Sequence, residues 1–309
     1  MLTEYQRLRN LEIPTEPADL VIDSDTYNEI DDQFAIAYAL ACPEKLHVQA
    51  LFAAPFFNER SSGPADGMER SYQEMLKLLS LAGKDLPVFR GSDRYLPDEQ
   101  TAVSSPAVQH LLSLACGYSA EHPLYVVAIG AITNIASALI LEPSLADRLV
   151  VVWLGGHALE WPQNAEFNCR QDVAAARVVF ASGVPLVMLP CMGVVSAFTT
   201  TGPELSWWLQ GKNRLCDYLV SNTVQAAERY AAGRVWSRVL WDVTAVAWLM
   251  NQDECFMCHR LIPTPIPEYD HHYAFDSTRP FCRYVWQIRR DPLMQDLFTK
   301  LTGSGPAIS

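Results

Sequence analysis

Five carboxylates fall within one short segment near the start of the chain, VIDSDTYNEIDDQFAIAYAL at 21–40. They are Asp23, Asp25, Glu29, Asp31 and Asp32. Two carboxylates about 5 Å apart repel by roughly 3 kcal/mol at an effective dielectric constant of about 20, so a tight cluster needs a cation or bound protons. Oxygen ligands without a nearby histidine or cysteine suit Ca²⁺ or Mg²⁺ better than zinc. The segment therefore predicts a site for a hard cation, and the alternative is a solvated acidic loop.

The elements on either side fix where this segment lies. The apolar run at 18–22 reads as a buried strand, and 31–40 reads as a helix whose first turn holds Asp31 and Asp32. Ligands of open α/β sheets bind beyond the carboxyl ends of the strands, which is where the segment falls. The helix dipole adds only about 0.3–1 kcal/mol for each carboxylate, which is too little to hold the cluster together.

The rest of the chain alternates short apolar runs with helix-length segments. We expect strands at 18–22, 47–52, 86–89, 124–129, 149–154 and 185–190, and helices at 68–82, 105–116 and 172–181. A helical pattern then runs from 203 to 250, followed by extended segments at 261–276 and 281–288 and a helix at 291–301. This order predicts an α/β fold, with a mostly parallel central sheet flanked by helices around a Rossmann-type core. We expect one domain over 1–309, because no repeat or linker divides the chain.

Composition narrows the class of function. The net charge of −12 and the pI near 5.0 would repel a phosphate backbone, so nucleic acid is not an expected partner and a small-molecule substrate is. The first twenty residues lack the apolar core of a signal peptide, and no run reaches the roughly 18 apolar residues of a membrane span. We therefore expect a cytoplasmic protein that does not bind membranes and whose eight cysteines are reduced.

Two local motifs suggest other chemistry. VIDSDT resembles the opening of aspartate-nucleophile phosphatases, although Tyr27 stands where that pattern has Thr or Val. CFMCH at 255–259 has the spacing of covalent haem attachment, which normally needs export. Cys255, Cys258 and His259 also form a permissible zinc set with His271 or His272. We expect instead that these cysteines are reduced and lie around a helix end and loop.

Several segments, taken in order, resemble one family. DSD followed by IDD resembles the N-terminal signature DTDPGxDD of the inosine-uridine nucleoside hydrolases. Matches follow in the family's order at VAIGAITNIA (127–136), WLGG (153–156), AEFN (165–168), WDVTAVA (241–247) and RRDPLMQDLFTKL (289–301). The resemblance spans almost the whole chain, and the joint order is far more specific than any one motif. It implies a nucleoside hydrolase-like fold and Ca²⁺-dependent cleavage of the N-glycosidic bond of a nucleoside or related ribosyl compound.

The resemblance also implies roles for residues at matching positions. The implied Ca²⁺ ligands are the side chains of Asp25, Asp32 and Asp242 and the carbonyl of Ile129. Asp25 would also accept the proton of the attacking water, and Asp31 would hold a ribose hydroxyl. Other sugar contacts would come from Glu166, Asn168 and Asn58, the last in the loop after the second strand. The resemblance further implies a homodimer or homotetramer.

Three departures from the family pattern bear on the substrate. Five residues rather than three separate Asp25 from the Asp pair, which leaves the place of Glu29 open. Upstream of AEFN, either Glu160 or Asn164 stands in for a family asparagine.

The third departure is Trp241, which replaces the histidine that often helps to protonate the leaving base. An indole N–H is a donor only and cannot transfer a proton near neutral pH. We expect Trp241 to form a stacking wall and His157, just after WLGG, to be a leaving-group contact. Either another group protonates the leaving group, or that group needs no proton, or the protein is a non-catalytic or redirected sugar-binding protein.

Overall fold

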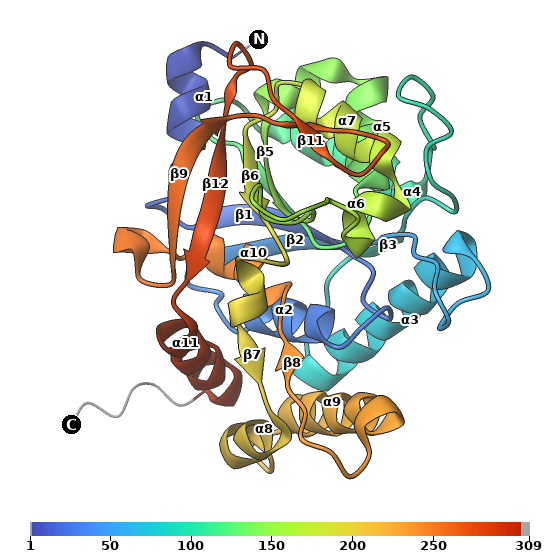
Figure 1. Ribbon diagram of the computed structural model, residues 1–309, viewed down its shortest axis with the longest axis vertical. Coiled ribbons are helices and arrows are strands. Elements are labelled where there is room, and N and C mark those ends of the chain that lie inside the picture. Colours follow the sequence, from blue (N-terminus) through green and yellow to red (C-terminus); the bar gives the residue numbers. More distant parts are fainter. Residues whose placement is uncertain (1, 304–309) are drawn as a thin grey trace.

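A central sheet of eight strands runs through the molecule in the order β3-β2-β1-β4-β5-β6-β12-β9 (Figure 1). The computed structural model describes residues 2–303. The strands are β1 (Ala18–Ser24), β2 (Leu46–Ala53), β3 (Val88–Arg90), β4 (Leu124–Ala128), β5 (Leu149–Leu154), β6 (Leu186–Leu189), β9 (Met257–Pro263) and β12 (Phe281–Ile288). The edge strand β9 pairs antiparallel with β12, and the other neighbours in this sheet pair in parallel. The predicted mostly parallel α/β sheet is confirmed.

Helices cover both faces of this sheet. The main covering helices are α2 (Asp31–Leu40), α3 (Pro64–Ala82), α4 (Pro106–Leu114), α5 (Thr133–Leu141) and α7 (Val173–Ala181). Successive strand residues point to opposite faces, so Ile22 and Val127 lie in one apolar cluster whereas Val21 and Val126 lie in the other. This double burial explains why the strands read as continuous apolar runs rather than as alternating ones.

The remaining elements lie around the sheet and its ends. The other helices are α1 (Glu4–Asn10), α6 (Phe167–Gln171), α8 (Gly202–Leu209), α9 (Arg214–Ala231), α10 (Val243–Trp248) and α11 (Arg290–Thr302), with short 3₁₀ turns at 115–117, 143–147, 195–197 and 252–254. Two small antiparallel pairs join β7 (Thr199–Thr200) to β8 (Arg238–Val239) and β10 (Ile266–Pro267) to β11 (Tyr273–Ala274). In Figure 1 the β7–β8 pair leads from the sheet toward α8 and α9.

Three expected boundaries were wrong. The helical pattern at 203–250 is broken between α9 and α10, because Gly233 adopts a positive φ of 70° and the chain then returns in extended form through β8. The extended segment at 261–276 contains a turn between β10 and β11. In the CFMCH motif, Cys255 lies at the end of the 3₁₀ turn at 252–254 as expected, but Cys258 lies in edge strand β9 rather than in a loop.

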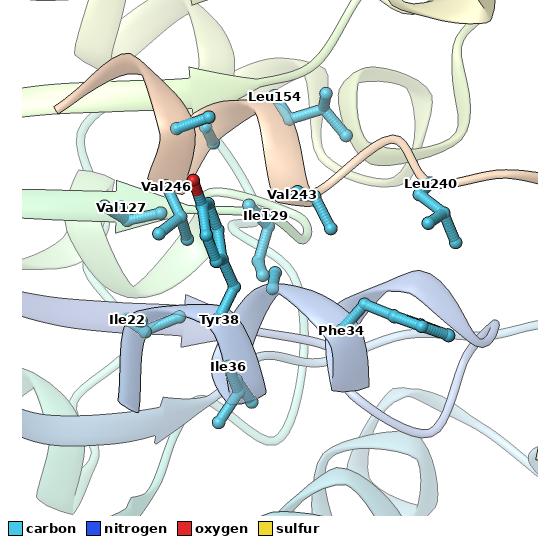
Figure 2. Close-up of a cluster of buried hydrophobic side chains, with 14 of the residues drawn as sticks. Ile22, Phe34, Ile36, Tyr38, Val127, Ile129, Leu154, Leu240, Val243 and Val246 are labelled. Carbon is cyan, nitrogen blue, oxygen red and sulfur yellow. The ribbon is translucent and has the colours of Figure 1, made fainter. Parts of the chain in front are cut away.

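Apolar packing between α2 and α10 holds the two helices together beneath the carboxyl ends of the strands. Figure 2 shows Phe34 and Tyr38 of α2 facing Val243 and Val246 of α10, with Ile129 between the two helices. All of these side chains are buried. The packing fixes the first residues of α2 relative to the residue that precedes α10, and those residues carry carboxylates.

No helix among residues 2–303 has the length and apolar character needed to cross a membrane. The expected single domain over 1–309 includes residues 1 and 304–309, which lie outside the described residues.

Candidate active site

A cavity of about 190 Å³ opens at the carboxyl ends of β1, β4, β5 and β6. The residues that line it are Asp25, Asn28, Glu29, Asp31, Asp32, Ile129, Leu154, His157, Glu166, Phe167, Asn168, Cys191, Met192, Trp241 and Asp242. Asp25 follows β1, Ile129 follows β4, Leu154 ends β5 and Cys191 lies just beyond β6. The acidic segment and the later motif residues therefore meet at the edge where α/β sheets bind ligands.

Three carboxylates converge on one point in this cavity. Asp31, Asp32 and Asp242 each place one oxygen within 4.8 Å of the others, and all three side chains are buried. Asp31 and Asp32 begin α2, whereas Asp242 immediately precedes α10. Ser24 steadies one of them, because its hydroxyl donates to Asp32 Oδ1 at 2.5 Å.

Asp25 adds a fourth carboxylate with an unusual lack of partners. Its side chain is 1% exposed, and its Oδ2 is buried without a hydrogen-bond donor among the described residues. Leaving such an oxygen unpaired costs about 1–3 kcal/mol or more, which a cation ligand would avoid. The three-carboxylate group contains Asp31 and not Asp25, whereas the family resemblance implies Asp25 as a ligand. Both side chains line the same cavity.

Without a cation, these acids hold protons unusually tightly. Burial, reinforced by Glu29 and Asp32, raises the pKa of Asp31 to about 8. Burial also raises the pKa of Asp32 to about 6, although the hydrogen bond from Ser24 opposes that rise. Burial and the neighbouring carboxylates raise the pKa of Asp25 and of Asp242 well above the usual range. An all-oxygen donor set in this state fits a hard divalent cation.

The AEFN motif builds a polar wall of the cavity. Glu166 caps α6, with Oε1 accepting from the Asn168 N–H at 2.9 Å and Oε2 accepting from the N–H groups of Gly156 and Cys169, each at 2.9 Å. The Asn168 side-chain amide donates to the Leu154 carbonyl at 3.1 Å. These bonds hold two predicted sugar contacts rigidly at the ends of β5 and α6.

Gly156 of WLGG allows this close approach. Its φ is +73°, and a Cβ at this position would lie 2.2 Å from Tyr273 Oη and 2.7 Å from Asn164 Oδ1. Any larger residue would displace the turn that presents the Gly156 N–H to Glu166.

Asn164, not Glu160, is the inner residue upstream of AEFN. Asn164 is buried, and its Oδ1 accepts from the His157 N–H at 2.7 Å. The Glu160 side chain is 73% exposed and pairs with Arg260. Neither Asn164 nor Glu160 lines the cavity. Asn164 influences the cavity only by holding the backbone of His157, which does line it.

The lengthened acidic loop places Asn28 in the lining of the cavity, whereas Asn58 lies outside the lining. Asn58 does not line the cavity, but its Nδ2 donates to Asn28 Oδ1 at 2.6 Å. Arg60 donates to the carbonyls of Asn28 and Glu29, and its guanidinium lies over the ring of Tyr27. These four contacts hold the loop in place, and an ion pair between Glu29 and Arg238 fixes it further.

Trp241 and His157 both line the cavity, as expected for leaving-group contacts. His157 Nδ1 accepts from the Met192 N–H at 3.3 Å, so the neutral ring carries its proton on Nε2. Burial lowers the pKa of His157, which favours this neutral form. Its ring also meets Trp161 edge to face, with 6.0 Å between centroids.

Sequence reasoning did not name Asn28, Leu154, Phe167, Cys191 and Met192 as lining residues, and it left the place of Glu29 open. Cys191 and Met192 follow a predicted strand and Leu154 ends one, so the strand-end rule was a usable signal for these three. Phe167 lies inside the AEFN motif, which was the signal for it. Asn28 was hidden in the inserted residues of the acidic loop.

Comparison with known proteins agrees with this geometry. The sequence model of the inosine-uridine preferring nucleoside hydrolases matches residues 20–279. The chain belongs to this family. The resemblance found in the sequence is thereby confirmed, and VIDSDT is part of the nucleoside hydrolase signature rather than a phosphatase motif.

Curated nucleoside hydrolases are related to this chain over part of their length. The pyrimidine-specific ribonucleoside hydrolase RihA of Escherichia coli is 31% identical over 183 residues, which are 51% of this chain and 56% of that protein. RihA of Salmonella typhimurium is 30% identical over 194 residues, or 55% of this chain and 58% of that protein. The match thus spans little more than half the length of these curated relatives.

Solved structures, a nucleoside hydrolase among them, share the fold over almost the whole chain. The purine-preferring ribonucleoside hydrolase from Gardnerella vaginalis superposes with a TM-score of 0.74 at 20% identity, covering 92% of this chain and 98% of that one. The type III effector protein XopQ, solved with adenosine diphosphate ribose, gives a TM-score of 0.70 at 17% identity, covering 97% and 99%. This nucleoside hydrolase-like fold is therefore shown for nearly the whole chain.

The motif at 255–259 does not form a metal centre in this family member. Cys255 is exposed, whereas Cys258 is buried and accepts a hydrogen bond from Arg289. Over residues 2–303, Asp31, Asp32 and Asp242 are the group of three or more potential ligands that the fold gathers closely enough for a metal ion. All eight cysteines are unpaired.

Proposed function

We propose that the protein is a hydrolase that cleaves the N-glycosidic bond of a nucleoside or a related ribosyl compound. Membership of the nucleoside hydrolase family supports this activity. The observation that carries it is the meeting of Asp25, Asp31, Asp32 and Asp242 with Glu166 in one cavity. Pyrimidine-specific hydrolysis by one relative and purine-preferring hydrolysis by another support the same bond as the target.

We assign the metal site to the side chains of Asp25, Asp32 and Asp242 and to the carbonyl of Ile129, and its ion to Ca²⁺. The fit rests on the unpaired Oδ2 of Asp25, the oxygen-only donor set and the raised pKa values of the cluster. Ca²⁺ bound there would lower the pKa of the attacking water and orient the sugar diol.

In this proposal the residues that line the cavity have separate roles in catalysis and in sugar binding. Asp25 accepts the proton of the water that attacks the anomeric carbon, and the surrounding carboxylates stabilise the oxocarbenium-like sugar. Asp31, Glu166 and Asn168 hold sugar hydroxyls. Asn58 supports Asn28, which takes the place at the cavity that was expected for Asn58 itself.

Two further residues face the leaving group in this scheme. Trp241 forms a flat apolar wall, and His157 offers its Nε2–H as a donor. Because the His157 ring is neutral, its role is a hydrogen-bond contact rather than the supply of a proton.

We further propose that the whole chain acts as one domain in the cytoplasm, as a homodimer or homotetramer, on a small-molecule substrate. Light scattering coupled to size exclusion measures the assembly state directly.

The test is release of reducing sugar from a panel of nucleosides and a nitrophenyl riboside, with Ca²⁺ and then with a chelator. We expect Ca²⁺-dependent release from at least one riboside and its loss in Asp242→Asn. If no riboside is cleaved but sugars or ribosides bind by calorimetry, the alternative of a non-catalytic sugar-binding protein replaces this proposal. That alternative is favoured by Trp241, which removes the usual acid.

A further inference from the structure

The turn between β10 and β11, residues 268–272, contacts the polar wall of the cavity from behind, although none of residues 266–274 lines the cavity. The carbonyl of His271 accepts from the backbone N–H of Asn164 at 2.5 Å. His271 reaches this position with a φ of +62°, in the left-handed region that residues other than glycine rarely adopt. A strained residue persists only where the surrounding structure holds it, so this turn has a defined place against the wall.

Polar contacts with α7 hold the same turn from its other side. Arg177 of α7 donates to the Pro267 carbonyl and to Glu268 Oε2, each at 2.8 Å. Arg177 also pairs with Glu99 at 2.6 Å, and the Tyr269 hydroxyl donates to the same carboxylate at 3.0 Å. The turn is therefore fixed between α7 and the polar wall, and so is the strand that follows it.

Tyr273, the first residue of β11, places its hydroxyl against Gly156. A Cβ at Gly156 would lie 2.2 Å from Tyr273 Oη, so the hydroxyl occupies the space that a side chain would need. Gly156 donates its N–H to Glu166 Oε2 at 2.9 Å. Because a glycine backbone is freer than any other, contact with the hydroxyl restricts the group that Gly156 presents to Glu166. Tyr273 is thus linked to Glu166 through one backbone N–H.

The hydroxyl of Tyr273 does not stabilise the folded protein through a hydrogen bond. Its oxygen is buried and has no hydrogen-bond partner among the described residues. Leaving a buried polar group unpaired is unfavourable, and a phenylalanine ring would fill nearly the same space without that cost. The contact with Gly156 therefore gives this oxygen a role other than stability.

We infer that Tyr273 is a positioning residue for sugar binding: its hydroxyl fixes Gly156, and the Gly156 N–H orients the Glu166 carboxylate. This inference rests on the proposed function, in which Glu166 holds a sugar hydroxyl. Glu166 Oε2 accepts from the N–H groups of Gly156 and Cys169, whereas Oε1 accepts from the Asn168 N–H alone and so can accept a further bond. Anchoring Oε2 sets the direction in which Oε1 meets the sugar.

The experiment uses Tyr273→Phe, which removes the hydroxyl and keeps the ring. One hydrogen bond corresponds to about fivefold in an equilibrium constant, so the Kd of the Ca²⁺-loaded protein for ribose, measured by calorimetry, should rise about fivefold. KM for nitrophenyl riboside should rise with it, while kcat changes by less than about twofold, as expected when binding alone is weakened. The melting temperature should not fall, because the variant loses no hydrogen bond. A purely structural role would instead lower the melting temperature.

Tyr125→Phe is the matched control, because Tyr125 is a buried tyrosine near the start of β4, at the other end of the sheet. It should leave the Kd for ribose and the KM unchanged.

Gly156→Ala tests the contact itself. The added methyl group would meet Tyr273 Oη at 2.2 Å, whereas the ring carbon Cζ, at 3.4 Å, would be in ordinary contact. Gly156→Ala should therefore weaken ribose binding. Tyr273→Phe in the same chain should recover part of that loss, although it weakens binding when made alone.

The outcomes separate this inference from the proposed function. Unchanged ribose binding in Tyr273→Phe, or weaker binding together with a lower melting temperature, overturns the positioning role and leaves the hydrolase activity standing. A double variant that binds ribose no better than Gly156→Ala overturns Gly156 as the route. If the parent protein binds ribose but cleaves no riboside, the proposed activity fails, and the ribose titrations still decide the role of Tyr273. Failure of the parent both to bind ribose and to cleave a riboside overturns both proposals.

Discussion

The backbone N–H of Asp242 donates to Oδ2 of Asp31 at 3.4 Å, joining residues that are 211 positions apart in the sequence. The bond links the residue before α10 to the first turn of α2, and the apolar packing between those helices holds it in place (Figure 2). Two carboxylate-bearing turns are thereby fixed face to face. The fold cannot relieve their repulsion by moving them apart, so it must bind a cation or protons.

A bound metal ion should therefore stabilise the folded protein. At a Ca²⁺ concentration about 100 times its dissociation constant, mass action adds about 2.7 kcal/mol to the free energy of unfolding. We expect the melting temperature to rise by several degrees with Ca²⁺ and to fall again with chelator, measured by differential scanning fluorimetry. Asp242→Asn should abolish that rise, and a Ca²⁺ response that persists in this variant would place the ion elsewhere.

Changing Asp25 to asparagine and changing Asp31 to asparagine should have different effects on Ca²⁺ binding and on catalysis. Asp25→Asn should weaken Ca²⁺ binding by more than about tenfold and reduce turnover by at least about 100-fold, because it removes the proposed metal ligand and the proposed proton acceptor together. Asp31→Asn should mainly raise KM, because it loses a sugar contact. Calorimetric titration with Ca²⁺ and measurement of kcat and KM for both variants test these assignments. The opposite pattern would make Asp31 the ligand, in line with the closely spaced group that it forms with Asp32 and Asp242.

The sequence predicted most of the sheet because its strands are buried on both faces. Runs such as 149–154 are apolar throughout, and their order along the chain is that of a parallel sheet with covering helices. The strand-end rule then placed the acidic segment with Asp25 at the edge of the sheet where the cavity opens, whereas Ile129 came from the family resemblance. Asp242 could be joined to them only through the family resemblance, since no local pattern shows that α10 packs on α2.

Other features depend on contacts that no local pattern encodes. The break at 232–242 was missed because the apolar spacing continues across it, while pairing of β8 with β7 is a tertiary interaction. Asn28 was missed because its position depends on Arg60 and Asn58, which lie about thirty residues further along. Tertiary contacts of this kind override local propensity.

Asn28 and Asn58 should behave as one unit. The Asn58 amide holds Asn28 Oδ1 at 2.6 Å, so Asn58→Ala should raise KM by about as much as Asn28→Ala, although Asn58 lies outside the cavity. The double variant should raise KM little more than either single variant does, because the effects of substitutions within one hydrogen-bond network are not additive. Additive effects on KM in this double-mutant cycle would show that the two side chains act independently.

His157 should contribute as a neutral donor across the physiological pH range. Burial lowers its pKa, so the ring stays neutral above about pH 6.5, and any penalty from charging it appears only as the pH falls below that value. We expect turnover not to decline between pH 6.5 and 8.5 on account of this residue. His157→Gln, which keeps a donor, should retain more activity than His157→Ala. A loss of activity as the pH rises through 6.5, absent in His157→Gln, would instead make it a proton donor.

Trp241 decides whether ordinary nucleosides can be substrates. The base of inosine or uridine needs protonation as it leaves, and a positioned acid lowers the barrier by about 3–5 kcal/mol. Both nucleosides should therefore be poor substrates compared with nitrophenyl riboside, an activated riboside whose leaving group departs as a stable anion. Trp241→His puts a titratable ring next to Asp242 and should raise kcat/KM for inosine or uridine by at least about tenfold. It should also lower efficiency on the activated riboside, because the flat wall is lost. Trp207→His, an 80% exposed position on α8, controls for the substitution itself. Comparable efficiency of the parent protein on nucleosides and on the activated riboside would show that another acid already acts at this site, and the histidine variant would then bring no gain.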